Sequence, residues 1–426
     1  MPSGTAAASP PRATPVAPLD PLPRHFGRYT LFDRIGEGGM ARIYLARAKT
    51  QLGGVRLVVV KQILPLLSRS AQFCRLLIQE AKLAASLSHS NIVQVLDLGR
   101  EESLLYIAME YVEGFDLRQL VRHCSRQRVE LPIEFALHIV THVLQGLDFA
   151  HRRTDEQDAP MAVVHRDVSP SNVLLSFDGE VKLCDFGIAR ALEAGQKLAE
   201  EAVIGKAGYM SPEAASGAPL DARSDVFSVG VILWELIAGA RLYRAAPGQL
   251  PAIEQARRAQ ITLPVERGYP RESQLRDILR RALEKSPANR YESARAMLRD
   301  LEDYIANSGL IASPLHFGEW MMKSFGGDIV KERRARERAA MAVEAGPLLE
   351  ISPLGSSQEA REPPPSSHRG AAPPSPRRAR RKRMVAAPHP EVSAPQPGTK
   401  VRELTWALAF LGALLLVTLL AALLLR

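Results

Sequence analysis

Two short polar segments, His165–Asn172 and Asp185–Gly187, each follow a run of apolar residues. The first segment contains Asp167 and Asn172, and the second begins with Asp185. A carboxylate can orient an attacking hydroxyl group and accept its proton. An amide oxygen and a second carboxylate are hard oxygen ligands of the kind that Mg²⁺ prefers beside a phosphate. These residue types in this order predict phosphoryl transfer, in which positioning and charge neutralisation provide most of the catalysis.

The apolar runs predict a strand before each polar segment. Val163-Val164 precedes the first segment and Val181-Lys182-Leu183-Cys184 precedes the second. Taken alone, the two segments are ordinary polar turns at strand ends, which is the commoner origin of such a pattern. Their order and spacing, together with companion segments elsewhere in the chain, favour a catalytic role.

A glycine-rich segment, Ile35–Tyr44, precedes both turns and reads I-G-E-G-G-M-A-R-I-Y. Glycines such as Gly36 and Gly38 let a hairpin approach phosphates closely, so that backbone N–H groups face the anionic oxygens. Alone this signal is weak, because a glycine-rich hairpin is more often only a turn.

A lysine and a glutamate form the next candidate pair. Lys61 ends the β-branched run Leu57–Val60, and an apolar stripe with helical spacing begins at Phe73. Glu80 falls on the inward face of that helix, where a carboxylate is costly unless it meets a cation. We therefore expect Lys61 and Glu80 to pair; the alternative is a solvated glutamate on the edge of the helix.

The polar segments match the pattern H-R-D-x-x-x-x-N followed by D-F-G, so the chain resembles the eukaryotic-like bacterial serine/threonine protein kinase family. The Val168-Ser169-Pro170 run is similar to a myxobacterial branch. The resemblance covers about residues 28–301. It implies an α+β, two-lobed protein kinase fold, with a small β-rich N-terminal lobe and a larger α-helical C-terminal lobe, and it implies ATP and Mg²⁺ as cofactors.

The resemblance also assigns roles to the residues of the site. Asp167 would orient the acceptor hydroxyl, Lys61 would contact the phosphates, and Glu80 would fix Lys61. Asn172 and Asp185 would bind Mg²⁺. The residues expected at the nucleotide are Ile35, Gly36, Gly38, Ile43, Lys61, Glu110, Val112 and Asp116.

Within this set, the segment after the predicted strand Leu104–Met109 is expected to be the hinge between the lobes. The Glu110 carbonyl and the Val112 amide would contact adenine, with Met109 as gatekeeper and Asp116 near the ribose. Downstream, Asp225 is expected to brace the backbone of the catalytic loop. Glu213 is expected to pair with Arg290 inside the large lobe.

Five positions depart from the family pattern, one of which, Ile43, stands at the valine position of the glycine-rich segment. Ala41 replaces the third glycine, Ser169 replaces the lysine that supports the transferring phosphoryl group, and Ser211 replaces an alanine. Lys206 stands where a threonine normally helps to mark Ser/Thr specificity. The loss of one cation near the transition state is expected to slow transfer unless Lys206 offsets it.

The expected activation loop contains no Ser or Thr from Ile188 to Met210. The usual switch phosphorylates a threonine there, which then pairs with the residue that corresponds to Arg166. We expect Glu200 or Glu201 to serve instead as a fixed anion, so that loop phosphorylation does not activate the chain. The alternative, at about even odds, is that both carboxylates are simply solvated.

The composition fits one two-lobed domain with additional segments. The chain has 426 residues and 3 cysteines, Cys74, Cys124 and Cys184, without paired spacing, which is typical of a reducing cytoplasm. Cys184 is expected beside the nucleotide as a small buried residue. The domains expected along the chain are a disordered Pro/Ala-rich arm (1–27), the kinase domain (28–305), a helical extension (306–342), a disordered Pro/Arg-rich linker (343–403) and a transmembrane helix (404–425).

The apolar segment 404–425 carries no charge and is long enough to cross a bilayer. Six of the seven residues 377–383 are basic, whereas only Arg426 follows the span. The positive-inside rule therefore predicts a single-pass C-terminal anchor with the kinase domain in the cytoplasm. The basic patch is expected to contact anionic lipid, and the alternative is a nucleic-acid or nuclear-import signal. We expect no nucleic-acid partner, and a homodimer remains open.

The sequence thus predicts a membrane-anchored kinase that phosphorylates Ser/Thr hydroxyls of protein substrates. The chief alternative is a pseudokinase scaffold that acts through protein binding, which Ser169, Lys206 and Ala41 favour and the intact catalytic set opposes. A kinase of small molecules is a third alternative, opposed by the activation-segment and Asp225 motifs.

Overall fold

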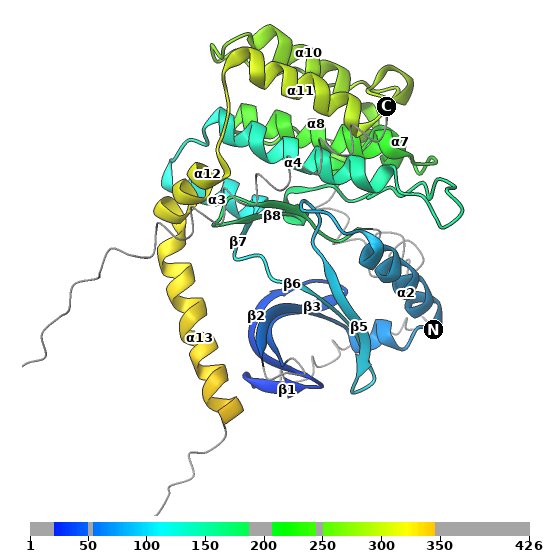
Figure 1. The fold of residues 1–426 in the computed structure, drawn as a ribbon. Helices are drawn as coiled ribbons and strands as arrows, with labels where there is room; N and C mark the ends of the chain where they lie inside the picture. Colours follow the sequence, from blue (N-terminus) through cyan, green and yellow to red (C-terminus); the bar gives the residue numbers. More distant parts are fainter. Residues whose placement is uncertain (1–20, 50–53, 187–206, 244–249, 346–426) are drawn as a thin grey trace, which may run out of the picture. The chain divides into compact units, whose positions relative to one another are not determined.

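The computed structural model describes residues 21–49, 54–186, 207–243 and 250–345. These form two lobes, as expected from the resemblance, with a β-rich N-terminal lobe and a helical C-terminal lobe (Figure 1). Residues 1–20 of the expected disordered arm, residues 188–206 of the expected activation loop, the expected linker from residue 346 and the expected transmembrane helix (404–425) lie outside the described residues. Residues 24–26 of the expected disordered arm form a short strand. None of the helices in the described ranges is long and apolar enough to cross a membrane.

The small lobe is an antiparallel sheet with strand order β1-β2-β3-β4-β6-β5 and one long helix, α2. Its elements are β1 (Arg24–Phe26), β2 (Tyr29–Glu37), β3 (Ala41–Lys49), β4 (Val55–Ile63), α1 (Pro65–Ser68), α2 (Ala71–Ser86), β5 (Val95–Glu101) and β6 (Leu104–Glu110).

Local sequence accounts for the elements that carry the predicted site residues. The β-branched run before Lys61 becomes β4, which pairs with β3 and β6 on its two sides. Helix α2 begins after Ser70, whose hydroxyl accepts the N–H of Phe73 at 3.3 Å. Its buried face includes Glu80, which is 7% exposed, in agreement with the predicted inward position.

The large lobe begins with a three-stranded sheet and continues as helices. Its elements are β7 (Gly114–Asp116), α3 (Leu117–Gln127), α4 (Ile133–His151), η1 (Pro170–Asn172), β8 (Val173–Ser176), β9 (Val181–Leu183), η2 (Ala207–Tyr209), α7 (Pro212–Ala215), α8 (Ala222–Ala238), α9 (Ala252–Arg258), α10 (Glu272–Ala282), η3 (Pro287–Asn289) and α11 (Ala294–Ser308).

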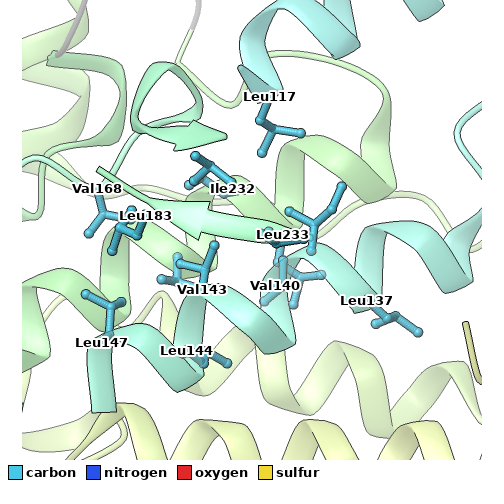
Figure 2. Packing of buried hydrophobic residues seen from close by; sticks show 14 of the residues in the cluster. Leu117, Leu137, Val140, Val143, Leu144, Leu147, Val168, Leu183, Ile232 and Leu233 are labelled. Carbon is cyan, nitrogen blue, oxygen red and sulfur yellow. The ribbon is translucent and has the colours of Figure 1, made fainter. Parts of the chain in front are cut away.

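The core of the large lobe surrounds α4. This helix is apolar on most of its surface, as expected of a helix buried on several sides. Figure 2 shows its side chains meeting Leu183 from β9 and Leu233 from α8. The core therefore fixes the short strands that flank the two polar segments.

One sequence expectation for this lobe is wrong. Val163-Val164 is not part of a strand, although Val163 is buried in the core. The following backbone N–H groups of His165 and Arg166 are taken by a side chain, Asp225, and not by a neighbouring strand. Arg166 also has φ 67°, which ends any extended run.

A helical extension follows α11. It consists of α12 (Pro314–Met321), the π-helical turn η4 (Met322–Gly326) and α13 (Gly327–Ala345). Helix α12 packs on the large lobe, whereas α13 runs beside β2 of the small lobe (Figure 1). The extension therefore contacts both lobes.

Candidate active site

One buried carboxylate, that of Asp225, holds the backbone of the catalytic loop in place. Asp225, at the start of α8, is 1% exposed. It accepts the backbone N–H groups of His165 at 2.8 Å and Arg166 at 2.9 Å, as predicted, and also contacts Nε2 of His151 at 2.8 Å. The loop conformation thus depends on a side chain from a different helix.

The same loop is tied to the segment that carries Asp185. Nε2 of His165 lies 3.0 Å from the carbonyl oxygen of Cys184, and the rings of His165 and Phe186 are 4.5 Å apart. The backbone N–H of Cys184 donates to the carbonyl of Asn172 at 2.9 Å. These contacts bring the two polar segments of the sequence together.

The predicted base and one predicted metal ligand contact each other directly. Nδ2 of Asn172 donates to Oδ2 of Asp167 at 2.8 Å and to the Asp167 carbonyl at 2.8 Å. Since the side-chain amide nitrogen of Asn172 faces Asp167, the side-chain oxygen Oδ1 of Asn172 is the atom that a hard cation would take. The bond to Oδ2 orients the Asp167 carboxylate.

The second predicted ligand lies beside the predicted lysine. Nζ of Lys61 is 2.8 Å from Oδ1 of Asp185, and Asp185 has φ 64°, an uncommon backbone angle for a non-glycine residue. Backbone strain of this kind is typical of functional sites. The predicted ion pair between Lys61 and Glu80 stays a prediction.

Lys61 and Asp185 both line a cleft between the two lobes. Seven residues predicted at the site line it, namely Ile35, Ile43, Lys61, Glu110, Val112, Asp116 and Asp185. Gly36 pairs with Ile43 next to it, and the N–H of Gly38 donates to the Ala41 carbonyl at 3.0 Å in the β2–β3 turn. Of the predicted nucleotide residues, Gly36 and Gly38 are not among those that line the cleft, although their neighbours Ile35 and Ile43 are.

Two of the predicted nucleotide residues also have structural roles. The Asp116 carboxylate caps α3 by accepting the N–H of Gln119 at 2.7 Å. Burial raises the pKa of Asp116, although that hydrogen bond opposes the effect. The Glu110 side chain forms an ion pair with Lys182 at 2.9 Å, so only the backbone of Glu110 is suited to the predicted adenine contact.

Cys184 lines the cleft, as predicted. Burial and the nearby Asp185 carboxylate hold the pKa of its thiol well above the usual value. A thiol that resists ionisation is a poor nucleophile and a poor redox sensor, in keeping with the small buried residue expected here.

Two of the residues that depart from the family pattern, Ser169 and Ser211, form local hydrogen-bond contacts. The Ser169 hydroxyl, 3% exposed, lies 3.1 Å from that of Ser171, which lines the cleft. The Ser211 hydroxyl caps α7 by accepting the N–H of Ala214 at 3.3 Å. Lys206, Glu200 and Glu201 lie outside the described residues.

The predicted ion pair inside the large lobe is present. Nη1 of Arg290 is 2.6 Å from Oε1 of Glu213, and the Arg290 side chain is fully buried. Burial alone would raise the pKa of Glu213, but the bonds from Arg290 and Ser224 outweigh it and hold that pKa below its usual value. The pair anchors the end of the activation segment to the lobe.

Sequence reasoning missed one side of the cleft. Ile329, Glu332, Arg333 and Arg336 of α13 line it together with the expected residues. In the sequence these positions belong to a run rich in charges, which is typical of a solvated helix. No local pattern indicates that this run faces a binding site.

The residues present fit a nucleotide with a divalent cation. Lys61 supplies a cation at the base of the cleft, while Asp185 and the Asn172 oxygen supply oxygen ligands. The hinge residues Glu110 and Val112 line the same cleft. The protein kinase family in general uses ATP and Mg²⁺ in this manner.

Comparisons with known proteins agree with this geometry. The family model described as "Protein kinase domain" matches residues 29–301. The chain is 38% identical over 322 residues to the tyrosine-protein kinase MasK of Myxococcus xanthus, covering 73% of this chain and 50% of that protein. It is 37% identical over 282 residues to the serine/threonine-protein kinase PknB of Mycobacterium leprae, covering 64% of this chain and 42% of that protein.

A solved structure extends the comparison to three dimensions. The PknI kinase domain of Mycobacterium tuberculosis aligns with a TM-score of 0.50 and 28% identity, over 68% of this chain and all (100%) of that one. The chain spans half or less of the length of the two curated relatives. The matched family model covers the catalytic loop, the buried braces described above and every cleft-lining residue except those of α13. The chain therefore belongs to the protein kinase family, in its eukaryotic-like bacterial form.

Proposed function

We propose that this chain is an ATP-dependent kinase that transfers the γ-phosphoryl group of ATP to Ser or Thr hydroxyls of protein substrates. The observation that carries the proposal is the presence of two pairs, Asp167 with Asn172 and Lys61 with Asp185, of which Asp167, Asn172 and Asp185 lie on two segments that are hydrogen-bonded to each other. A scaffold that had lost catalysis would have no need of this full set.

Each residue has a task that follows from its position. The Asp167 carboxylate, held by Asn172, orients the acceptor hydroxyl and takes its proton as the oxygen–phosphorus bond forms and ADP leaves. Lys61 holds the phosphates of ATP by charge. Mg²⁺, when bound by Asn172 and Asp185, neutralises charge on the transferring group.

The acceptor residue has two candidates. The relatives named serine/threonine-protein kinases favour Ser and Thr, whereas MasK is named a tyrosine-protein kinase. Ser169, in the position where Ser/Thr kinases usually have lysine, gives no support to the Ser/Thr class. We retain Ser and Thr as the proposed acceptors and treat Tyr as the second candidate.

Label transfer tests both points. Purified full chain incubated with radiolabelled ATP and Mg²⁺ is expected to label itself or a general acceptor protein, and acid hydrolysis is expected to yield phosphoserine or phosphothreonine. Phosphotyrosine alone would assign the second class. No label above that of an Asp167→Asn, Asp185→Asn double variant, with folding verified by circular dichroism, would favour the pseudokinase scaffold.

We further propose that residues 404–425 anchor the chain in a membrane with the kinase domain in the cytoplasm, and that the basic patch 377–383 contacts anionic lipid. Support comes from the uncharged length of the first segment and the charges of the second. Formation of a homodimer stays a prediction, because none of the contacts among the described residues tests it.

Arginines in the middle of the proposed span test the anchor. Each arginine at a helix centre disfavours insertion by about 2.5–3.5 kcal/mol. The Leu415→Arg, Leu416→Arg double variant is therefore expected to move from the carbonate-resistant membrane fraction to the soluble fraction. The matched Leu415→Ala, Leu416→Ala variant is expected to remain with the membrane. Wild-type chain found in the soluble fraction would contradict the proposal.

A further inference from the structure

Helix α13 forms one side of the cleft between the lobes. Its residues Ile329, Glu332, Arg333 and Arg336 line the same cavity as Lys61. The protein kinase family match ends at residue 301, so this side of the cavity is built from a part of the chain beyond the match. The question is what holds this helix in place.

The extension is fixed to the large lobe by close packing. A Cβ atom on Gly318 of α12 would lie 2.3 Å from the Phe177 carbonyl oxygen, so only glycine allows this approach. Phe325 of η4 is 8% exposed and packs edge-on against the rings of Phe115 and Trp320. The N-terminal end of α13 is therefore set by the large lobe.

The other end of α13 is fixed to the small lobe. Ala340 is 0% exposed and packs in a cluster with Phe32 and Leu45. Between the two ends, Nε of Arg336 is 2.9 Å from Oδ2 of Asp33 on β2. The helix therefore spans from one lobe to the other along the edge of the cleft (Figure 1).

Arg333 joins the two attachments. Its Nη2 is 2.7 Å from Oε1 of Glu113, and its Nη1 is 2.8 Å from Oε2 of Glu337. Glu113 follows the hinge and its carbonyl accepts the N–H of Phe177 at 2.9 Å, which ties it to the large lobe. Oε1 of Glu337 is in turn 3.4 Å from Nη1 of Arg47 on β3.

Most of the charged side chains in this network are largely shielded from water. Arg333 is 8% exposed as a residue, and the Arg47 and Glu337 side chains are 10% and 17% exposed, whereas the Glu113 side chain is 38% exposed. Charges that are removed from water need their partners, because an unpaired buried charge is strongly disfavoured. The chain of contacts from hinge to β3 therefore resists separation of the lobes at this edge.

We propose that Arg333 is a positioning residue for the nucleotide: through Glu113 and Glu337 it holds α13 across both lobes as the outer wall of the cavity, and so raises the affinity for ATP. A ligand that binds between two lobes loses affinity when the lobes must first be ordered, and a helix that already bridges them removes part of this cost. The inference rests on the proposed function for the identity of the ligand.

Nucleotide affinity in the full chain tests the inference. Arg333→Ala is expected to raise the Kd for a fluorescent ADP analogue and the KM for ATP about fivefold or more, within the range of coupling between sites, with little change in kcat. Arg334→Ala is the matched control, because Arg334 is an exposed neighbour on the same helix that does not line the cavity. It is expected to bind nucleotide like the wild type.

Charge reversal separates the ion pair from a general loss of folding. Glu113→Arg and Arg333→Glu are each expected to weaken nucleotide binding. The double variant is expected to recover only part of the loss, because it restores the contact between positions 113 and 333 but leaves Glu337 facing a carboxylate. Ala340→Arg places a charge in the contact with Phe32 and Leu45 and is expected to raise the Kd in the same way; Ala340 does not itself line the cavity, although Leu45 does. The unfolding midpoint of each variant shows that the domain is folded.

The outcomes decide the inference without reference to catalysis. Unchanged or tighter nucleotide binding in folded Arg333→Ala and Ala340→Arg would overturn it. Because binding is measured without a protein acceptor, a chain that binds nucleotide in an α13-dependent way but transfers no phosphoryl group would contradict the proposed function alone. A chain that transfers phosphoryl groups with the same KM in all variants would contradict this inference alone.

Discussion

Replacement of Asp167 by Asn is expected to lower kcat by about 10²–10⁴-fold, the usual contribution of a general base, while the Kd for nucleotide stays near that of the wild type. The carboxamide keeps the shape that meets Nδ2 of Asn172 at 2.8 Å but does not take a proton at neutral pH. The measurement is steady-state phosphorylation of a general acceptor protein, with nucleotide binding followed in parallel.

The matched control for this variant is Asp178→Asn. Asp178 is exposed on the turn between β8 and β9, close in sequence but outside the cleft, and its replacement is expected to leave kcat unchanged. Wild-type turnover in Asp167→Asn would show that another group takes the proton. A large rise in nucleotide Kd would show that Asp167 acts mainly through the structure of the cleft.

The second large effect is expected at Asp225. Asp225→Ala removes the acceptor of the His165 and Arg166 N–H groups and the partner of His151, all inside the protein. Breaking a buried charged interaction of this type costs about 3–5 kcal/mol. We expect a loss of that size in the free energy of unfolding, measured with denaturant, together with loss of phosphoryl transfer.

The contribution of Asp225 is also expected to depend on pH. Burial alone would raise the pKa of this carboxyl, but the bonds from His151 and the His165 N–H outweigh it and hold the pKa below its usual value. Its stabilisation is thus present above the unfolded pKa of about 4 and is lost as the pH falls through the lower folded pKa. The unfolding free energies of wild type and Asp225→Ala should therefore converge in acid.

Asp303→Ala provides the comparison for that experiment, because Asp303 is an exposed carboxylate on α11. It is expected to shift the free energy of unfolding by no more than about 0.5 kcal/mol, as is usual for surface positions. If Asp225→Ala unfolds with the same free energy as Asp303→Ala, the buried carboxylate is not the brace that the contacts indicate.

The sequence was most informative where a residue's chemistry constrains its position. Asp225 and the Glu213–Arg290 pair were predicted from the family resemblance and are present, because buried charges need specific partners. The two lobes were likewise implied by the family resemblance and are present. Predictions about Glu200, Glu201 and Lys206 concern residues outside the described ranges.

The sequence was least informative where a contact joins distant segments. The strand expected at Val163-Val164 is absent because Asp225, a residue of another helix, takes the N–H groups that follow it. Arg333 gave no signal, because its partner Glu113 is remote in the chain and the surrounding charges are typical of a solvated helix. Periodicity reports which face of a helix is apolar, and it does not report which charges meet.

The position of α13 also has a pharmacological consequence. A competitive inhibitor that reached outward from the hinge would touch Ile329 and Arg333, residues that lie beyond the segment matched by the protein kinase family model. Compounds built to contact these two side chains would draw part of their affinity from a surface outside the shared catalytic domain. Selectivity for this chain over other kinases would then come from α13, while the adenine contacts would stay those of the family.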